Sequence, residues 1–434
     1  MRLSLVALII GTATHAADLP APVDDADYAP VSRAEAELGQ LLFYDAILSG
    51  NRSVSCATCH HPRFGTGDGV SLSLGDGGIG LGPARKPDPE NLPEQRIPRN
   101  AQALFNLGAR EFTVLFHDGR IEADPTRNSG LRTPMEDEMI AGFSSLLSAQ
   151  TMFPVLSGDE MAGHYSENEI SQAVRMGRIT GDGGAWDLLS KRVSDIPTYA
   201  SMFTDTYPHI DKPSDIAFTD ISNAIASFIA FEWRSDTSPF DAFLRGEVSF
   251  DETARDGLDL FYGSAGCADC HSGPFQTDHG FHATGQPQFG PGKAARFEDH
   301  QRDTGRMRVT GRAQDAYAFR TPSLRNVTRT GPYGHTGAYP TLETFLKQHG
   351  RGLDEGFDQR LPILATIESN DWWVFERPEE VTQIAQSAKK FGLEISDDDI
   401  AALIAFLETL DDPTALSGRL GIPESVPSDL PVEK

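Results

Sequence analysis

The 434-residue chain is poor in basic residues, with 37 Lys and Arg against 63 Asp and Glu, which gives a formal net charge of -26. A surface this acidic repels nucleic acid and anionic membranes, so both classes of partner are excluded. Long apolar runs are also lacking, because no segment after residue 10 approaches the roughly 18 apolar residues that a membrane span requires. Alternating strand patterns are scarce as well, which predicts a mainly α-helical protein.

The first residues form an exception to this lack of apolar runs. Arg2 precedes an apolar stretch from Leu3 to Ile10, and small residues follow around Thr14 and Ala16. This pattern predicts a signal peptide over residues 1–16, cleaved near Ala16, and therefore export to the periplasm. A membrane anchor made of the uncleaved apolar stretch is the alternative.

Cysteine is rare, and its four positions fall into two copies of one pattern, "CATCH" and "CADCH". Cys-x-x-Cys-His is the attachment signature of c-type haem, in which the thiols bond the haem and the histidine binds the iron. A thioredoxin-like redox pair or a zinc site is the alternative, but one zinc shared by both pairs would close a loop of about 200 residues. The sequence therefore predicts two haem c groups, on Cys56, Cys59 and His60 and on Cys267, Cys270 and His271.

Helical signals surround both motifs. Ser249, with Glu252 three residues later, predicts the start of a helix that leads to the second motif, and Ser396 with Asp399 predicts the start of a closing helix. An apolar helix over 220–233 is suited to packing between domains. Two long segments rich in Gly, Pro and charge, 71–100 and 283–308, predict irregular loops. We expect two cytochrome c-like haem domains, over residues 17–240 and 241–434.

At this point the sequence resembles the bacterial dihaem cytochrome c peroxidases and their MauG-type relatives. The resemblance rests on "LGQLLFYDAILSGNRSVSCATCHHP", "RNAQALFNLG", "FHDGR", "SPFDAFLRGE", "GLDLFYGSAGCADCHSGPF" and "FRTPSLRNVTRTGPYGHTGAYPTLETFLKQHG". It implies that the N-terminal haem reacts with hydrogen peroxide. The C-terminal haem would take electrons from a small donor protein, either a mono-haem cytochrome c or a cupredoxin. A homodimer is compatible with the sequence.

The resemblance also implies a set of residues beside the peroxide-binding haem. Gln150, Pro154 and Glu160 match the family's distal pocket, with spacings of four and ten residues. A glutamate at this place accepts a proton from peroxide and returns it to the leaving oxygen, while a glutamine orients the exchange. The alternative for Glu160 is a solvated surface acid.

Asn100, Thr330 and Pro332 match the positions that bind a calcium ion between the haems in the family. One side-chain amide and two backbone carbonyls, completed by water, suit this cation. Because backbone carbonyls carry no residue identity, structural turn residues are the alternative.

The family places a Met or a Tyr as the sixth ligand of the second haem, at a position that aligns with His349. Helical spacing supports this residue independently, since Leu342, Phe345, Leu346 and His349 share one face. A buried histidine without a ligand role is the alternative, and Tyr339, Met307 and His335 are competitors. An imidazole in place of a thioether would lower the potential of this haem.

Two departures from the family pattern alter the expected chemistry. Asp76 stands where some relatives carry a histidine that closes the first haem, sixteen residues after His60. We therefore expect the iron of that haem to react without prior reduction. His117 replaces the tryptophan between the haems, so it is predicted either to bridge interhaem electron transfer or to be a surface histidine.

Further differences bear on the competing functions. No aromatic residue lies between Tyr262 and Cys267, where MauG-type enzymes carry a tryptophan used to oxidise a partner protein. Peroxide reduction is accordingly favoured over a MauG-like oxidase that modifies a protein or organic substrate. A non-catalytic dihaem electron carrier is the other alternative. The segment 122–147 is longer than in the family and is predicted to form a lid over the distal pocket.

Overall fold

The computed structural model describes residues 18–293, 300–349, 374, 377–388 and 395–434, so the predicted signal peptide lies outside the described residues. Helices make up most of the regular structure, as expected. Their bounds are α1 Arg33–Tyr44, α2 Cys56–Cys59, α3 Leu146–Thr151, α4 Glu169–Arg175, α5 Ala185–Ser194, α6 Pro197–Thr206, α7 Phe218–Glu232, α8 Pro239–Leu244, α9 Glu252–Tyr262, α10 Met307–Thr310, α11 Leu342–His349, α12 Pro378–Ser387, α13 Asp397–Glu408 and α14 Pro413–Ser417.

The strands are short, and each pairs only with the strand before or after it in chain order. They are β1 Gly78–Ile79, β2 Lys86–Pro87, β3 Val114–Leu115, β4 Ile121–Ala123, β5 Leu131–Arg132, β6 Phe281–His282 and β7 Phe319–Arg320. The pairs are antiparallel, with orders β1-β2, β3-β4-β5 and β6-β7. None of the helices in the described ranges is long and apolar enough to cross a membrane.

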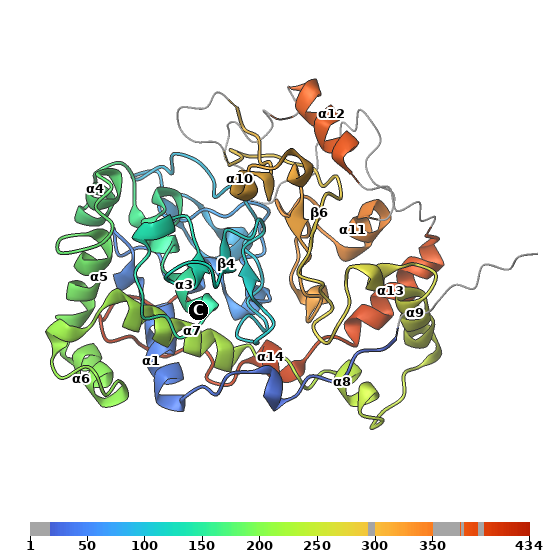
Figure 1. The fold of residues 1–434 in the computed structure, drawn as a ribbon, viewed down its shortest axis with the longest axis horizontal. Coiled ribbons are helices and arrows are strands. Elements are labelled where there is room, and N and C mark those ends of the chain that lie inside the picture. Colours follow the sequence, from blue (N-terminus) through green and yellow to red (C-terminus); the bar gives the residue numbers. More distant parts are fainter. Residues whose placement is uncertain (1–17, 294–299, 350–373, 375–376, 389–394) are drawn as a thin grey trace, which may run out of the picture.

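The two halves of the chain each contain a pair of helices in contact at a glycine. In the first half, a Cβ on Gly39 of α1 would lie 1.8 Å from the carbonyl oxygen of Ala224 in α7. In the second half, a Cβ on Gly257 of α9 would lie 1.9 Å from the carbonyl oxygen of Ala402 in α13. Only glycine permits backbones to approach this closely. Each pair includes the helix that precedes a Cys-x-x-Cys-His motif, and the two pairs lie on opposite sides of the molecule (Figure 1).

Hydrophobic side chains gather into two main clusters. The larger contains residues from Val23 to Trp233 together with Phe275, Ala415 and Val426, and the smaller contains residues from Phe240 to Leu410. Helix α7 belongs to the larger cluster, so its apolar face packs inside the first half and not between domains as we expected.

The last residues return to the first half of the molecule, and the C-terminus is seen over that half in Figure 1. Ala415 and Val426 belong to the larger hydrophobic cluster. The Glu232 carboxylate fixes this tail by accepting hydrogen bonds from the backbone N–H groups of Arg419, Leu420 and Gly421. The apolar residues of this tail thus contribute to the core of the first half.

A buried ion network joins the two halves. Arg99 donates two hydrogen bonds to Asp303, at 2.6 and 2.7 Å, and forms an ion pair with Asp118 at 2.9 Å. Because these side chains are almost fully buried, water screens their attraction little. The network therefore holds the segment after 300 against the loop that follows residue 71.

The predicted start of the closing helix is confirmed, since Ser396 and Asp399 form a capping box on α13. The predicted cap of α9, the helix that leads to the second motif, is wrong. Asp251, not Ser249, caps α9, and its carboxylate accepts a hydrogen bond from the Ala254 N–H at 2.9 Å. A carboxylate two residues closer to the first helical turn reaches this N–H, which Ser249 cannot do.

Candidate active site

The first Cys-x-x-Cys-His motif forms the short helix α2 and the residue that ends it. Nδ1 of His60 lies 3.0 Å from the carbonyl oxygen of Thr66, which leaves Nε2 as the nitrogen available to a metal. Burial raises the pKa of the Cys56 thiol to about 12 and also raises that of Cys59. Neutral, buried sulfur atoms suit thioether bonds to haem better than thiolate chemistry.

The second motif repeats this local arrangement. Cys267 begins a 3-10 turn, Cys267–Asp269, and Nδ1 of His271 lies 3.1 Å from the carbonyl oxygen of Gln276. Both cysteines and His271 line a cavity of about 300 Å³ whose walls are mostly apolar. A cavity of this chemistry, adjoining two thiols and an oriented imidazole, fits a covalently attached haem.

His349, at the end of α11, lines the same cavity. Its ring centroid lies 6.4 Å from that of His271. Metal–imidazole bonds are about 2 Å long, so one ion held between two imidazoles places their centroids roughly 6 Å apart. The observed separation fits a haem iron with His271 and His349 as its two axial ligands. Gly350, the next residue in the sequence, lies outside the described residues.

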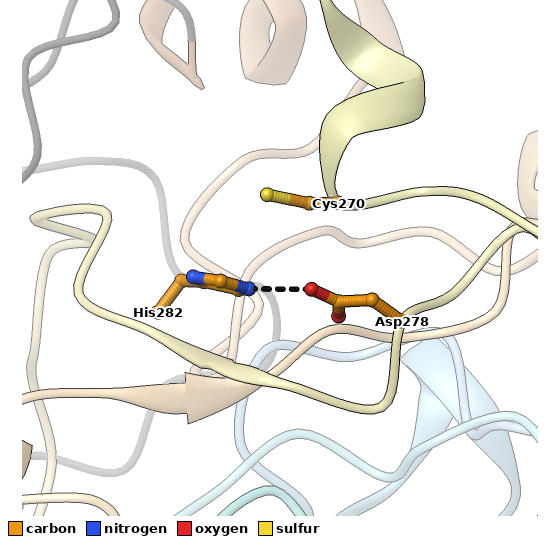
Figure 2. A group of neighbouring side chains, drawn as sticks. All are labelled: Cys270, Asp278 and His282. Atoms are coloured by element: carbon orange, nitrogen blue, oxygen red, sulfur yellow. Dashed lines mark hydrogen bonds and ion pairs between the residues drawn. The ribbon is translucent and has the colours of Figure 1, made fainter. Parts of the chain in front are cut away.

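Cys270 also lies near two other residues that bind metals in proteins (Figure 2). Nε2 of His282 is 2.8 Å from Oδ2 of Asp278, and the Cys270 sulfur completes a compact group of three. The sulfur belongs to the haem-attachment motif, and His282 lines the same cavity. This group is therefore part of the second haem site and not a separate metal centre.

The three predicted distal residues lie on consecutive short elements. Gln150 is in α3, Pro154 begins the 3-10 turn Pro154–Leu156, and Glu160 is in the π-helical turn Gly158–Ala162. The Oε1 atom of Gln150 is buried and has no hydrogen-bond partner among the described residues. A buried, unsatisfied amide is the observation expected where a bound molecule supplies the missing donor.

Glu160 is half-buried rather than fully solvated. Burial raises the pKa of its carboxyl, while the charges of Lys293 and Arg120 oppose that rise. The pKa of the Cys59 thiol is raised mainly by burial, then by the charge of Asp68, and is opposed by Arg85. The charge of Glu160 makes a smaller contribution to this rise, so the Glu160 carboxyl lies near the first motif. A carboxyl beside that motif with a raised pKa is suited to accepting and returning a proton.

The loop that follows the first motif packs directly on the backbone of Glu160. The Asp76 N–H donates a hydrogen bond to the Glu160 carbonyl at 2.9 Å. A Cβ on Gly75 would lie 2.2 Å from the Asp159 carbonyl oxygen and 2.4 Å from that of Glu160. Arg85 fixes this loop by donating to the carbonyl oxygens of Leu74, Gly75 and Gly80.

Asp76, at the position of the closing histidine in relatives, is held by other side chains. Its carboxylate accepts hydrogen bonds from Asn51 Nδ2 at 2.8 Å and from Ser53 Oγ at 2.7 Å. The side chain is fully buried. These contacts engage both oxygens within the loop.

The structure brings the remaining predicted site residues to the cavity of the second haem. Its lining includes Asn100, His117, Thr330, Pro332 and His335. Burial lowers the pKa of His117 well below its usual range, and the charges of Arg99 and His335 add to this effect. His117 is half-buried and lines this cavity. Its part in electron transfer, and the calcium site, stay predictions.

The competitors of His349 have other surroundings. His335 stacks on Phe319 with centroids 4.0 Å apart, and Tyr339 packs with Phe345 in a small apolar cluster. Met307 begins α10 and does not line the cavity of the second haem. Among these residues, His349 is the one that the structure places beside His271.

The segment 122–147, predicted to form a lid, is held at several points. It forms a small sheet through β4 and β5, and Glu122 pairs with Arg306 at 2.8 Å. The Asn223 side chain in α7 contacts the backbone at Gly142 and Ser144. The segment leads into α3, which carries Gln150, and its role as a lid stays a prediction.

Sequence reasoning missed the contribution of the C-terminal tail to the first motif. The Thr58 hydroxyl, inside α2, donates a hydrogen bond to the Glu433 carboxylate, which also lies 3.7 Å from Arg85. A residue 375 positions away thus supports the first haem site. No local pattern signals such a contact.

Comparisons with known proteins agree with this geometry. Residues 33–249 match the family model of the di-haem cytochrome c peroxidases. A cytochrome-c peroxidase, IdrP2, from Pseudomonas sp. (strain SCT) is 27% identical over 83% of this chain and 86% of its own length. The methylamine utilization protein MauG of Methylorubrum extorquens is 29% identical over 89% of this chain and 81% of its own.

Solved structures show the same fold. A crystal structure of a MauG-like protein associated with microbial copper homeostasis superposes with a TM-score of 0.60. The match covers 94% of this chain and 97% of that protein, at 24% sequence identity. At this identity the similarity establishes the fold alone.

Proposed function

The chain belongs to the di-haem cytochrome c peroxidase family, whose members are oxidoreductases acting on peroxide, and on that premise we propose specific roles for its residues. In this proposal the protein works in the periplasm and reduces hydrogen peroxide to water with electrons from a small redox protein. Haem c, when bound, supplies the iron that binds peroxide at one site and relays electrons at the other.

An asymmetry between the two haem sites carries the proposal. At the second site the ring centroids of His271 and His349 lie 6.4 Å apart, so both imidazoles would hold one haem iron. At the first site Asp76 takes the position of the closing histidine, and Asn51 and Ser53 bind its carboxylate. His60 would hold the haem iron of the first site, and Asp76 is engaged by Asn51 and Ser53 instead of offering a second imidazole.

Glu160 and Gln150 act on the substrate in this scheme. The Glu160 carboxylate accepts a proton from bound peroxide and returns it to the oxygen that leaves as water. Gln150 orients the substrate with its buried amide, and Pro154 holds the turn between these residues. The hydrogen bond from Asp76 to the Glu160 backbone keeps the carboxylate in place.

Electrons enter through the second haem. A formal charge of -26 favours a donor with a basic face, such as a mono-haem cytochrome c or a cupredoxin. His117 lines the cavity of the second haem and is our candidate for the interhaem path. A calcium ion held by Asn100, Thr330 and Pro332 would brace the same region.

Steady-state kinetics test the proposal. Purified holoprotein is mixed with a reduced small cytochrome c and hydrogen peroxide, and donor oxidation is followed optically. We expect peroxide-dependent turnover with two donors oxidised per peroxide, without a preceding reduction step. Donor oxidation that does not depend on peroxide would indicate an electron carrier, and peroxide consumption only with a protein or organic substrate would indicate a MauG-like oxidase.

A further inference from the structure

A second group of side chains of metal-binding type lies between the loop that supports Glu160 and the segment that follows the turn Gly158–Ala162. Asp76, His164 and Glu167 each offer one ligand atom, and these atoms lie within 4.8 Å of one another. We call these three residues the Asp76 cluster. It contains no cysteine of a haem motif and shares no residue with the cavity of the second haem.

The two carboxylates of the cluster differ in burial, since Asp76 is buried and Glu167 is exposed. Within the described ranges, no Lys or Arg forms an ion pair with Asp76 or Glu167, and His164 Nε2 lies 3.8 Å from Asp76 Oδ2. Asp76 is fully buried, so an unneutralised charge there is costly. Burial, together with the Glu167 carboxylate, raises the pKa of Asp76.

The imidazole in the cluster is also unsatisfied. Nε2 of His164 is buried and has no hydrogen-bond partner in the part of the chain that the structure describes. Asn51 Nδ2 lies between the two carboxylates and donates a hydrogen bond to each. In the cluster, one oxygen of Asp76 and one of Glu167 both accept from the Asn51 amide, and the buried His164 Nε2 has no hydrogen-bond partner among the described residues.

We propose that Asp76, His164 and Glu167 bind a divalent transition-metal cation beside the distal segment. Two carboxylates and one imidazole form a ligand set typical of Zn²⁺ and Mn²⁺ sites, whereas Ca²⁺ prefers oxygen ligands alone. The Asn51 amide moves aside when the cation binds, and water completes the coordination.

The proposed site is linked to the reaction segment by one backbone hydrogen bond and by the chain itself. Asp76 donates its N–H to the Glu160 carbonyl at 2.9 Å, and His164 follows the turn Gly158–Ala162 by two residues. A cation bound by both side chains would join the loop that contains Asp76 to the segment that contains His164, and both segments position Glu160. This inference concerns binding, and it stands whether or not the chain reduces peroxide.

Calorimetric titration of the holoprotein with Zn²⁺ tests the inference. The protein is first treated with a chelator and then kept in excess Ca²⁺, so that any oxygen-only site is filled. We expect one Zn²⁺ per chain. His164→Ala and Glu167→Gln are each expected to weaken this binding by at least about tenfold.

Glu169→Gln serves as the matched control, because Glu169 lies two residues from Glu167 and pairs with Arg192 at 2.7 Å. It should leave Zn²⁺ affinity unchanged. Thermal unfolding provides a second measurement, in which Zn²⁺ should raise the midpoint of the wild-type protein and of the control but not of the cluster variants. Equal Zn²⁺ binding by all proteins, or no saturable binding by the wild type, would overturn the assignment.

Discussion

His349 lies beside His271 with ring centroids 6.4 Å apart, although 77 residues separate them between the motif and the end of α11. Both residues line one cavity with Cys267 and Cys270. The geometry supports an iron with two imidazole ligands at the second site, and it distinguishes this site from the first.

The first prediction concerns this ligand pair. His349→Met should raise the reduction potential of the second haem, because a thioether stabilises ferrous iron better than an imidazole does. His349→Ala should remove the low-spin bis-imidazole signal from the paramagnetic resonance spectrum. His282→Ala is the control, since His282 lines the same cavity but pairs with Asp278. A wild-type spectrum in His349→Ala would refute the ligand assignment.

The second prediction concerns proton transfer. Glu160→Gln removes the base but keeps the shape of the side chain, so kcat/KM for peroxide should fall by about 10²–10⁴-fold. Stopped-flow mixing with peroxide measures this rate. Asp159→Asn, on the adjacent residue, is the control and should keep a rate close to that of the wild type. A Glu160→Gln rate within a factor of about two of the wild type would show that another group moves the proton.

The pH dependence provides a third test. Because burial raises the pKa of Glu160, the acid limb of the rate profile should lie above the ordinary titration range of a glutamate. The base form is the active one, so kcat/KM should fall as pH decreases through this raised pKa. This limb should be absent from the residual activity of Glu160→Gln. An unchanged limb in that variant would assign it to a different residue.

The fourth prediction concerns the buried network at the boundary of the two halves. Arg99→Met leaves the buried Asp303 carboxylate without its cation, while Asp118 keeps its pair with Arg120, and this should cost about 3–5 kcal/mol of the free energy of unfolding. Arg33→Met removes the exposed pair with Glu37 and should cost less than about 1 kcal/mol. Urea unfolding, followed by haem absorbance, compares the two variants.

The ion pair between Arg99 and Asp303 also predicts how acid affects the stability of the protein. Burial alone would raise the pKa of Asp303, but the charge of Arg99 outweighs it and lowers that pKa to about 2. A free aspartate titrates at about 4, so the contribution is complete above pH 4 and is lost as pH falls towards 2. Arg99→Met should lack this component of the acid transition. Equal stability of Arg99→Met and wild type at neutral pH would contradict the account.

The fifth prediction concerns the contact between the loop and the distal segment. Gly75→Ala places a methyl group 2.2 Å from the Asp159 carbonyl oxygen, so the two backbones must separate. We expect a loss of about 1–3 kcal/mol in stability and slower reaction with peroxide. Gly158→Ala is the matched control in the same region, since its methyl group would meet only the Gly163 carbonyl oxygen, at 3.4 Å. Equal effects of both substitutions would show that the contact does not position Glu160.

The sequence predicted the features that short patterns encode. The two Cys-x-x-Cys-His motifs, the cap at Ser396 and the apolar face ending at His349 depend on neighbours within a few residues, and the structure has these local elements. The predicted cap at Ser249 was wrong because Asp251, two residues later, caps α9. Packing decides between such neighbours, and the sequence pattern does not.

Contacts between distant segments could not be predicted. Arg99 meets Asp303 across 204 positions, and Thr58 meets Glu433 across 375. Charged residues of this kind are common on surfaces, so only the folded chain shows which of them are buried together. The Asp76 cluster was missed for the same reason, since Asp76 and the pair His164 and Glu167 come from separate loops.

Electron paramagnetic resonance of the resting ferric holoprotein, before and after addition of hydrogen peroxide, tests the asymmetry of the two haems most directly. The account predicts one high-spin signal from the His60 haem, which peroxide abolishes at once, and one low-spin bis-imidazole signal from the haem of His271 and His349. Two low-spin signals that peroxide leaves unchanged would contradict it.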